Sequence, residues 1–161
     1  MNISAPFDKH RETIQPEWID VNGHMNVGYY GLLFDHAVDI LFDFLGVGFD
    51  YIAATQCSVF QLETRTQFYQ ELTLGQPIRT KTHLIDFDQK RMHYWHQMEH
   101  AEEGWVAARM EAVSIHVDLK TRKSAPFPDN ALVILGRMQI AHEDLPRPEA
   151  FERTLGIRRE A

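Results

Sequence analysis

The stretch Asn26–Leu45, NVGYYGLLFDHAVDILFDFL, decides the fold because its apolar residues recur at the i, i+3, i+4, i+7 spacing of one helical face. That face consists of Tyr30, Leu33, Phe34, Ala37, Val38, Leu41, Phe42 and Leu45. Asn26 is a suitable N-cap, and Gly46 and Gly48 mark the end of the pattern. The pattern predicts one long amphipathic helix with a buried apolar face.

Downstream of this helix the hydrophobic period changes from 3.6 to 2, which is typical of strands. Between Phe60 and Phe68 apolar and polar residues alternate, which predicts a strand with one buried face and one face toward solvent or a subunit interface. Turn sequences separate the segments that follow. We predict three further strands and then a second helix, at Ile78–Phe87, Arg91–His100, Trp105–Val117 and Asn130–His142.

This order of elements predicts an α+β fold in which a curled antiparallel sheet of about five strands wraps one long central helix. We place this single domain at residues 1–145 and a charged, loosely attached tail at residues 146–161. The edge strands of such a sheet need protection from further pairing. We therefore expect a homodimer or a dimer of dimers.

Composition narrows the classes of function. With 161 residues, 44% of them hydrophobic, the chain has the size of one domain with a core. A formal charge of −7 argues against nucleic-acid binding. The sequence has neither an apolar run of about 18 residues nor a signal peptide, so we expect a cytoplasmic protein without membrane segments. Cys57 is the sole cysteine, which excludes an internal disulfide, and we predict that it is a buried strand residue.

A polar cluster of Asp20, Asn22, His24 and Asn26 stands directly before the long helix. The first backbone N–H groups of a helix have no intrahelical acceptor, so this position stabilises an anion or a polarised carbonyl. An aspartate before a helix is more often a cap than a catalyst, and Asn-Gly is an ordinary turn pair. The concentration of four such side chains within seven positions favours a catalytic site.

These residues resemble a known family, the hotdog-fold acyl-CoA thioesterases of the 4-hydroxybenzoyl-CoA thioesterase group. The resemblance spans Arg11 to Pro128 and implies that Asp20 is the catalytic aspartate. Its motifs are Asp20-x-Asn22-Gly23-His24-x-Asn26, Tyr30 followed by Phe34 and Asp35, and Tyr69-Gln70-Glu71 before Gly75. Within the group, three segments resemble betainyl-CoA thioesterases of carnitine breakdown, namely Glu17–Asn26, Cys57–Glu63 and Ser124–Pro128.

Thioester hydrolysis requires an activated water or a nucleophile, together with stabilisation of an oxyanion. Asp20 is the candidate general base, or the nucleophile that forms a mixed anhydride, and both mechanisms stay open. The helix N-terminus around Val27–Tyr30 is the candidate oxyanion site. His24 and Asn22 are predicted to orient the water or the carboxylate.

For substrate binding we predict contacts from residues near the polar cluster and from the following strand. They are Asn26, which also reads as a simple cap, Tyr29, Tyr30, Trp18, Phe60 and Glu71. Aromatic faces would hold the quaternary ammonium of a betainyl group by cation–π attraction of about 0.5–2 kcal/mol each. Phe60 and Tyr30 are equally expected in the core. For the phosphates of coenzyme A, the densest basic groups are Lys120, Arg122 and Lys123, and then Arg79 and Lys81.

Two other functions compete with hydrolysis. The first is an acyl-CoA hydratase or dehydratase of the same fold, whose histidine follows the aspartate by five residues and whose asparagine precedes a proline. Here His24 follows Asp20 by four residues, and Gly23 stands in place of that proline. The second is a non-catalytic acyl-CoA-binding domain.

We expect no cofactor besides the coenzyme A of the substrate, and no metal. The histidines of the predicted strands are the obvious candidates for metal ligands. His93 and His96, however, should point to opposite faces of one strand, so their side chains do not converge on an ion.

Overall fold

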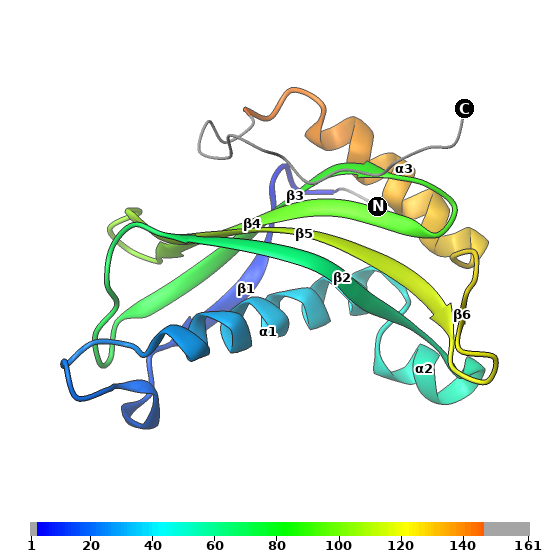
Figure 1. Cartoon of the computed structure of the whole chain (residues 1–161). Helices are drawn as coiled ribbons and strands as arrows, with labels where there is room; N and C mark the ends of the chain where they lie inside the picture. The colour runs from blue at the N-terminus through cyan, green and yellow to red at the C-terminus, as the bar shows by residue number, and fades with distance from the viewer. Residues whose placement is uncertain (1–2, 147–161) are drawn as a thin grey trace.

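A long helix, α1 (Val27–Leu45), lies along the concave face of a curled antiparallel sheet in the computed structural model, which describes residues 3–146 (Figure 1). The strand order is β1-β3-β4-β5-β2, and the short β6 pairs with β5. The strands are β1 (Phe7–Thr13), β2 (Cys57–Phe68), β3 (Pro77–Phe87), β4 (Arg91–His100), β5 (Val106–Asp118) and β6 (Lys123–Ser124). The predicted α+β architecture of one helix wrapped by five long strands is confirmed.

Helix α1 begins and ends where the sequence predicts. The side chain of Asn26 accepts a hydrogen bond from the N–H of Gly28 at 3.0 Å, and Gly46 closes the helix in a left-handed conformation with φ of +74°. All eight residues of the predicted apolar face are buried. This face and the inner face of the sheet form the core, which fixes the position of the helix N-terminus.

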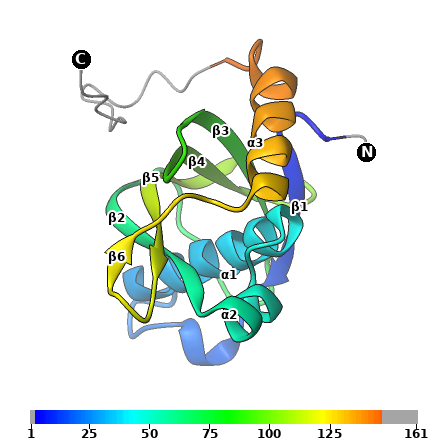
Figure 2. The ribbon, with the colours of Figure 1, turned by 90° about the vertical axis from the view of Figure 1, so that its right-hand side faces the viewer.

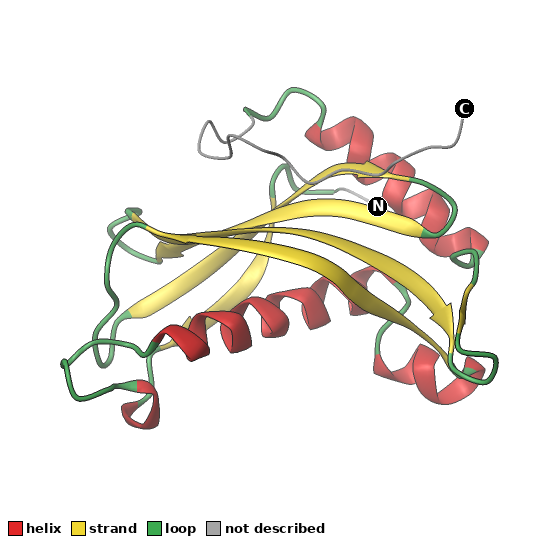
Figure 3. Ribbon diagram, in the orientation of Figure 1, coloured by secondary structure: helices red, strands yellow, loops and turns green. Residues whose placement is uncertain are grey.

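Helices cover the concave face of the sheet and the edge at β3. Figure 3 shows α1 and α2 (Phe49–Thr55) below the sheet, and Figure 2 shows α3 (Asp129–His142) running beside β1 and β3, where it contacts both β3 and α1. The second helix predicted near residues 130–142 is thus confirmed. Helix α2 was not predicted, because Gly46 and Gly48 read as the end of helical structure and the seven residues of α2 include no buried one.

Strand β2 differs from the prediction of one buried face. Phe60, Leu62 and Phe68 remain 41, 58 and 51% exposed, and Cys57 is half-buried rather than buried. The reason is position: β2 is an edge strand that pairs with β5, and a register shift between Gln61 and Glu63 interrupts the alternation of faces. An apolar strand edge is therefore left uncovered in the single chain.

Within residues 3–146, no helix combines the length and the apolar character needed to cross a bilayer. The predicted charged tail, apart from Pro146, lies outside the described residues.

Candidate active site

The polar cluster lies on a small hairpin that the chain forms before α1. Ile19 and Met25 form an isolated antiparallel bridge, and the N–H of Asp20 donates to the carbonyl of His24 at 3.0 Å. Gly23 adopts φ of +82°, which a side chain would make strained, so the Asn-Gly pair is needed for this three-residue turn. The N–H of Met25 donates to the carbonyl of Leu72 at 2.7 Å, which fixes the hairpin against the segment that follows β2.

The carboxylate of Asp20 is only partly engaged by the protein. Its Oδ1 accepts the N–H of Asn22 at 2.8 Å and lies 4.0 Å from Nδ1 of His24, which is too far for a hydrogen bond. No donor within residues 3–146 reaches Oδ2. The side chains of Asp20 and His24 are 20 and 34% exposed, so both are accessible to a ligand. One carboxylate oxygen is therefore available for water or substrate.

The N-terminus of α1 leaves one backbone donor available. The side chain of Asn26 binds the N–H of Gly28, and the Asn26 carbonyl accepts the N–H of Tyr29 at 3.1 Å. The N–H of Val27 has no acceptor within residues 3–146. Of the predicted oxyanion site, the structure thus singles out Val27 as the amide that neither the cap nor the first turn uses.

A pocket of about 260 Å³ opens between this hairpin, the first turn of α1 and the end of β2. It is lined by His24, Met25, Val27, Tyr30, Phe68, Tyr69, Gln70 and Glu71. The Tyr30 ring meets Phe68 edge to face, with 5.0 Å between centroids, and its hydroxyl is hydrogen-bonded to the Leu72 backbone. Burial raises the pKa of Tyr30, so the phenol stays protonated. The pocket is polar on the hairpin side and aromatic on the β2 side.

The structure brings together some of the predicted site residues. His24, Tyr30 and Glu71 line the pocket, and Asp20 is adjacent to His24. Trp18 and Tyr29 stack on each other at 5.9 Å outside the set of lining residues. Other predicted residues take local roles: the backbone N–H of the exposed Asn22 binds Asp20, and the Asn26 side chain caps the helix.

Phe60 is the predicted contact that the single chain does not bring to the pocket. It lies near the start of β2, whereas the pocket is at the end of that strand, and the guanidinium of Arg122 sits 5.6 Å from the centre of its ring. Conversely, sequence reasoning assigned Phe68 only to the strand pattern, and it did not single out Met25. The segment Tyr69-Gln70-Glu71 was visible as part of the family motif.

The basic residues considered for phosphate binding differ in availability. Arg79 and Lys81 both contact the carboxylate of Glu99, at 2.9 and 2.8 Å. Although burial opposes it, hydrogen bonds from Lys81, Gln97 and Arg79 hold the pKa of Glu99 below its ordinary value. Because these two cations are paired, the turn at Lys120–Lys123 is the better candidate of the two.

The strand histidines follow the predicted alternation of faces. His93 contacts Glu111 at 2.8 Å, whereas His96 stacks on Phe34 of α1. Burial lowers the pKa of His96 to about 3, so this ring is neutral at physiological pH. The two side chains do not converge on one site.

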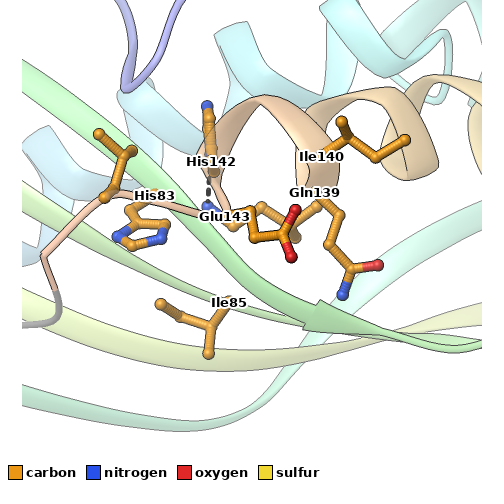
Figure 4. Close-up of a pocket in the computed structure, with 8 residues that line it drawn as sticks. His83, Ile85, Gln139, Ile140, His142 and Glu143 are labelled. Atoms are coloured by element: carbon orange, nitrogen blue, oxygen red, sulfur yellow. Dashed lines mark hydrogen bonds between the residues drawn. The ribbon is translucent and has the colours of Figure 1, made fainter.

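A second pocket, of about 340 Å³, lies between β3 and α3 and shares no lining residue with the first (Figure 4). His142 is its central polar side chain. Its Nδ1 accepts the N–H of Leu84 at 3.0 Å and its Nε2 donates to the carbonyl of Ser4 at 3.0 Å. Burial lowers the pKa of His142, which favours this neutral form. The ring therefore joins three segments of the fold, and we place the active site at the hairpin.

Comparison with known proteins identifies the family of the chain. A family model described as the thioesterase-like superfamily matches residues 14–135. The chain belongs to this superfamily. As a hotdog-fold thioesterase it is a thioester hydrolase, and the resemblance inferred from the hairpin motif is confirmed.

Individual relatives cover the whole domain. The chain is 33% identical to a betainyl-CoA thioesterase of Pseudomonas aeruginosa over 96% of this chain and 98% of that protein. It is 32% identical to an L-carnitine dehydrogenase/betainyl-CoA thioesterase of Rhizobium meliloti, over 99% of this chain but 32% of that protein. A putative thioesterase from Pseudomonas putida superposes with a TM-score of 0.79 at 29% identity, covering 97% of this chain and 99% of that one. A Staphylococcus aureus protein solved with CoA shares the fold, with a TM-score of 0.86 at 24% identity and coverage of 98% and 100%.

Proposed function

We propose that this thioesterase hydrolyses betainyl-CoA to betaine and coenzyme A. The observation that carries the proposal is that an available carboxylate oxygen on Asp20 and an available helix N-terminal N–H on Val27 both lie on the segment that borders one pocket. The similarity to a betainyl-CoA thioesterase over 98% of that protein's length supports the choice of acyl group.

In the proposed reaction, Asp20 acts on the thioester carbonyl directly or through water. As a general base it takes a proton from water while the water oxygen bonds to the carbonyl carbon; as a nucleophile its Oδ2 forms that bond and water later cleaves the anhydride. The carbonyl oxygen becomes an oxyanion that accepts the N–H of Val27. The C–S bond then breaks, and the CoA thiolate leaves with its electron pair and is protonated by solvent.

The pocket offers both kinds of group that bind a trimethylammonium. Glu71 supplies a carboxylate, and Tyr30 and Phe68 supply aromatic surface. A cationic acyl group thus gains electrostatic attraction that a neutral group of the same shape lacks.

The decisive assay compares betainyl-CoA with 3,3-dimethylbutanoyl-CoA, in which carbon replaces the ammonium nitrogen. We expect kcat/KM to be at least tenfold higher for betainyl-CoA, and this preference to fall in Glu71→Gln. Free thiol release is the readout. Equal rates for the two thioesters would contradict the acyl assignment while leaving hydrolysis intact.

The mechanism is tested separately with Asp20→Asn, which keeps the size and the local N–H contact of the side chain. We expect kcat to fall at least a thousandfold with either thioester, because an amide can neither take a proton from water nor attack the carbonyl. Undiminished thiol release by Asp20→Asn would remove Asp20 from the reaction.

We further propose that two copies of the chain pair through β2. The strand has an open hydrogen-bonding edge within the described chain, and the exposed side chains of Phe60, Leu62 and Phe68 lie along it. A two-fold axis through the middle of β2 reverses the strand direction, so the Phe60 end of one copy lies beside the Phe68 end of the other. This arrangement would bring the predicted contact at Phe60 toward a pocket.

Sedimentation velocity tests this pairing. We expect wild type to sediment as a dimer and Leu62→Asp as a monomer, because the substitution places a charge on each side of the two-fold contact. Val133→Asp, at a similarly exposed position on α3, is the matched control and should remain dimeric. A monomeric wild type at micromolar concentration would exclude this pairing.

A further inference from the structure

A cluster of two histidines and one glutamate lies between β1 and α1, apart from the hairpin and both pockets. His10 and Glu12 are two residues apart on β1 and so point to the same side of that strand, and His36 reaches them from α1. His10 Nε2 and His36 Nδ1 each lie 3.1 Å from Oε2 of Glu12. We propose that His10, Glu12 and His36 bind a divalent transition-metal ion, with Zn²⁺ as the preferred ion.

The spacing of the three atoms fits a tetrahedral ion. Zinc takes imidazole nitrogen at about 2.0–2.1 Å and carboxylate oxygen at about 2.0–2.2 Å, so ligand atoms around it stand roughly 3.4 Å apart. Two of the three separations here are 3.1 Å, and all three atoms lie within 4.8 Å of one another. The remaining adjustment falls to His36, whose side chain is 38% exposed and has solvent on one side.

The surroundings of His10 suit a metal ligand. Its Nδ1 lies 2.9 Å from the hydroxyl of Thr80, and both residues are buried. A hydroxyl can donate or accept, so Thr80 accepts Nδ1–H when Nε2 binds the ion and donates to Nδ1 when it does not. Such a partner on the second nitrogen holds the ring in orientation and fixes its tautomer.

The cluster is accessible to an ion from solvent. The side chain of His10 is 4% exposed, while Glu12 and His36 are 25 and 38% exposed, so the cluster is closed toward the core and open toward solvent. An ion can enter from that side and keep a water as its fourth ligand. We expected no metal because the histidines within one strand do not converge. The present cluster differs because its ligands come from two elements, β1 and α1, whose contact the spacing within a strand does not reveal.

The competing interpretation is a hydrogen-bonded cluster in which both imidazoles donate to Glu12. Isothermal titration of metal-stripped protein with ZnCl₂ distinguishes the two. We expect one Zn²⁺ per chain, with affinity at least a hundredfold weaker in His36→Ala and in Glu12→Gln. Asp39→Asn, which removes a carboxylate one turn further along α1, is the matched control and should bind as wild type does.

Two readouts that do not involve hydrolysis support the titration. Zn²⁺ at a hundred times its dissociation constant should raise the melting temperature of wild type by about 5–10 °C and leave that of His36→Ala unchanged. Thr80→Val should weaken binding about 10–100-fold, because it removes the partner of His10 Nδ1. Equal binding by wild type and His36→Ala, or no stoichiometric binding below 100 µM Zn²⁺, would overturn the proposal.

Discussion

At the hairpin and the start of α1, a carboxylate oxygen of Asp20 and the N–H of Val27 have no protein partner within residues 3–146, whereas in the larger pocket beside α3 both ring nitrogens of His142 are hydrogen-bonded. By volume alone, the second pocket would be the better candidate for the active site, at about 340 against 260 Å³. Polar groups already engaged by the fold contribute to stability, and groups held in place without a partner are available to a substrate. The following predictions test this division.

Among these predictions, the largest effect is expected from removing the N–H of Val27. Val27→Pro places proline at the first residue of α1, where the ring fits the helix and only the N–H is lost, and Asn26 already has an extended backbone. We expect kcat to fall about 10²–10³-fold, as for loss of one oxyanion donor, with little change in melting temperature. Val27→Ala is the control. A wild-type kcat in Val27→Pro would show that the oxyanion lies elsewhere.

At His142 we expect the reverse, a loss of stability with little change in kcat. His142→Ala removes a buried side chain and leaves the Leu84 N–H and the Ser4 carbonyl without that partner, so the free energy of unfolding should fall by about 2–4 kcal/mol. Urea denaturation measures this loss. The kcat of the folded fraction should stay within twofold of wild type, and a hundredfold loss of kcat at unchanged stability would reverse the assignment of the two pockets.

Acid should act on the fold through buried histidines. The pKa of His96 is about 3 in the folded protein against roughly 6.5 when unfolded, so above pH 6.5 the ring is neutral in both states and has no effect. Below pH 6.5 the unfolded chain binds the proton first, and stability decreases by up to about 2 kcal/mol between pH 6.5 and 5. Comparing urea midpoints at pH 7 and 5 in wild type and His96→Asn should show a smaller pH dependence in the variant. An equal decrease of the urea midpoint from pH 7 to pH 5 in both proteins would contradict this role of His96.

The smallest effect concerns Asn26, which was predicted both as a cap and as a substrate contact. The observed hydrogen bond from Gly28 to its side chain accounts for a cap, so Asn26→Ala should lower stability by about 1 kcal/mol. Asn26→Ser restores a capping oxygen and should recover most of it. If KM rises tenfold in both variants, the amide also contacts the substrate and belongs with Asp20 rather than with His142.

Sequence alone predicted the elements whose patterns are local. The apolar spacing of α1 and its cap at Asn26 are properties of neighbouring residues, and both are confirmed. Placement of Glu71 beside His24 depended on the family motif, since 47 positions separate the two residues. Exposure of Phe60 could not be predicted, because alternation shows that a strand has two faces but not whether another element covers them.

The candidate metal cluster shows the same limit more clearly. Nothing in the spacing of His10 and Glu12 points to His36, which follows the whole hairpin in the sequence and is not part of the predicted apolar face of the helix. Packing of α1 against β1 brings the three together. Contacts of this kind depend on how elements dock, which the periodicity of one element does not specify.

The open edge of β2 also has a consequence for how the protein behaves in dilute solution. If the edge is covered by a second copy, each folded chain stabilises another, and the midpoint of thermal unfolding increases with the amount of protein present. The same protein would then unfold at a lower temperature at nanomolar assay concentrations than at micromolar concentrations. Activity measured across such a dilution series would depend on the fraction of chains that are paired as well as on the catalytic rate of each chain.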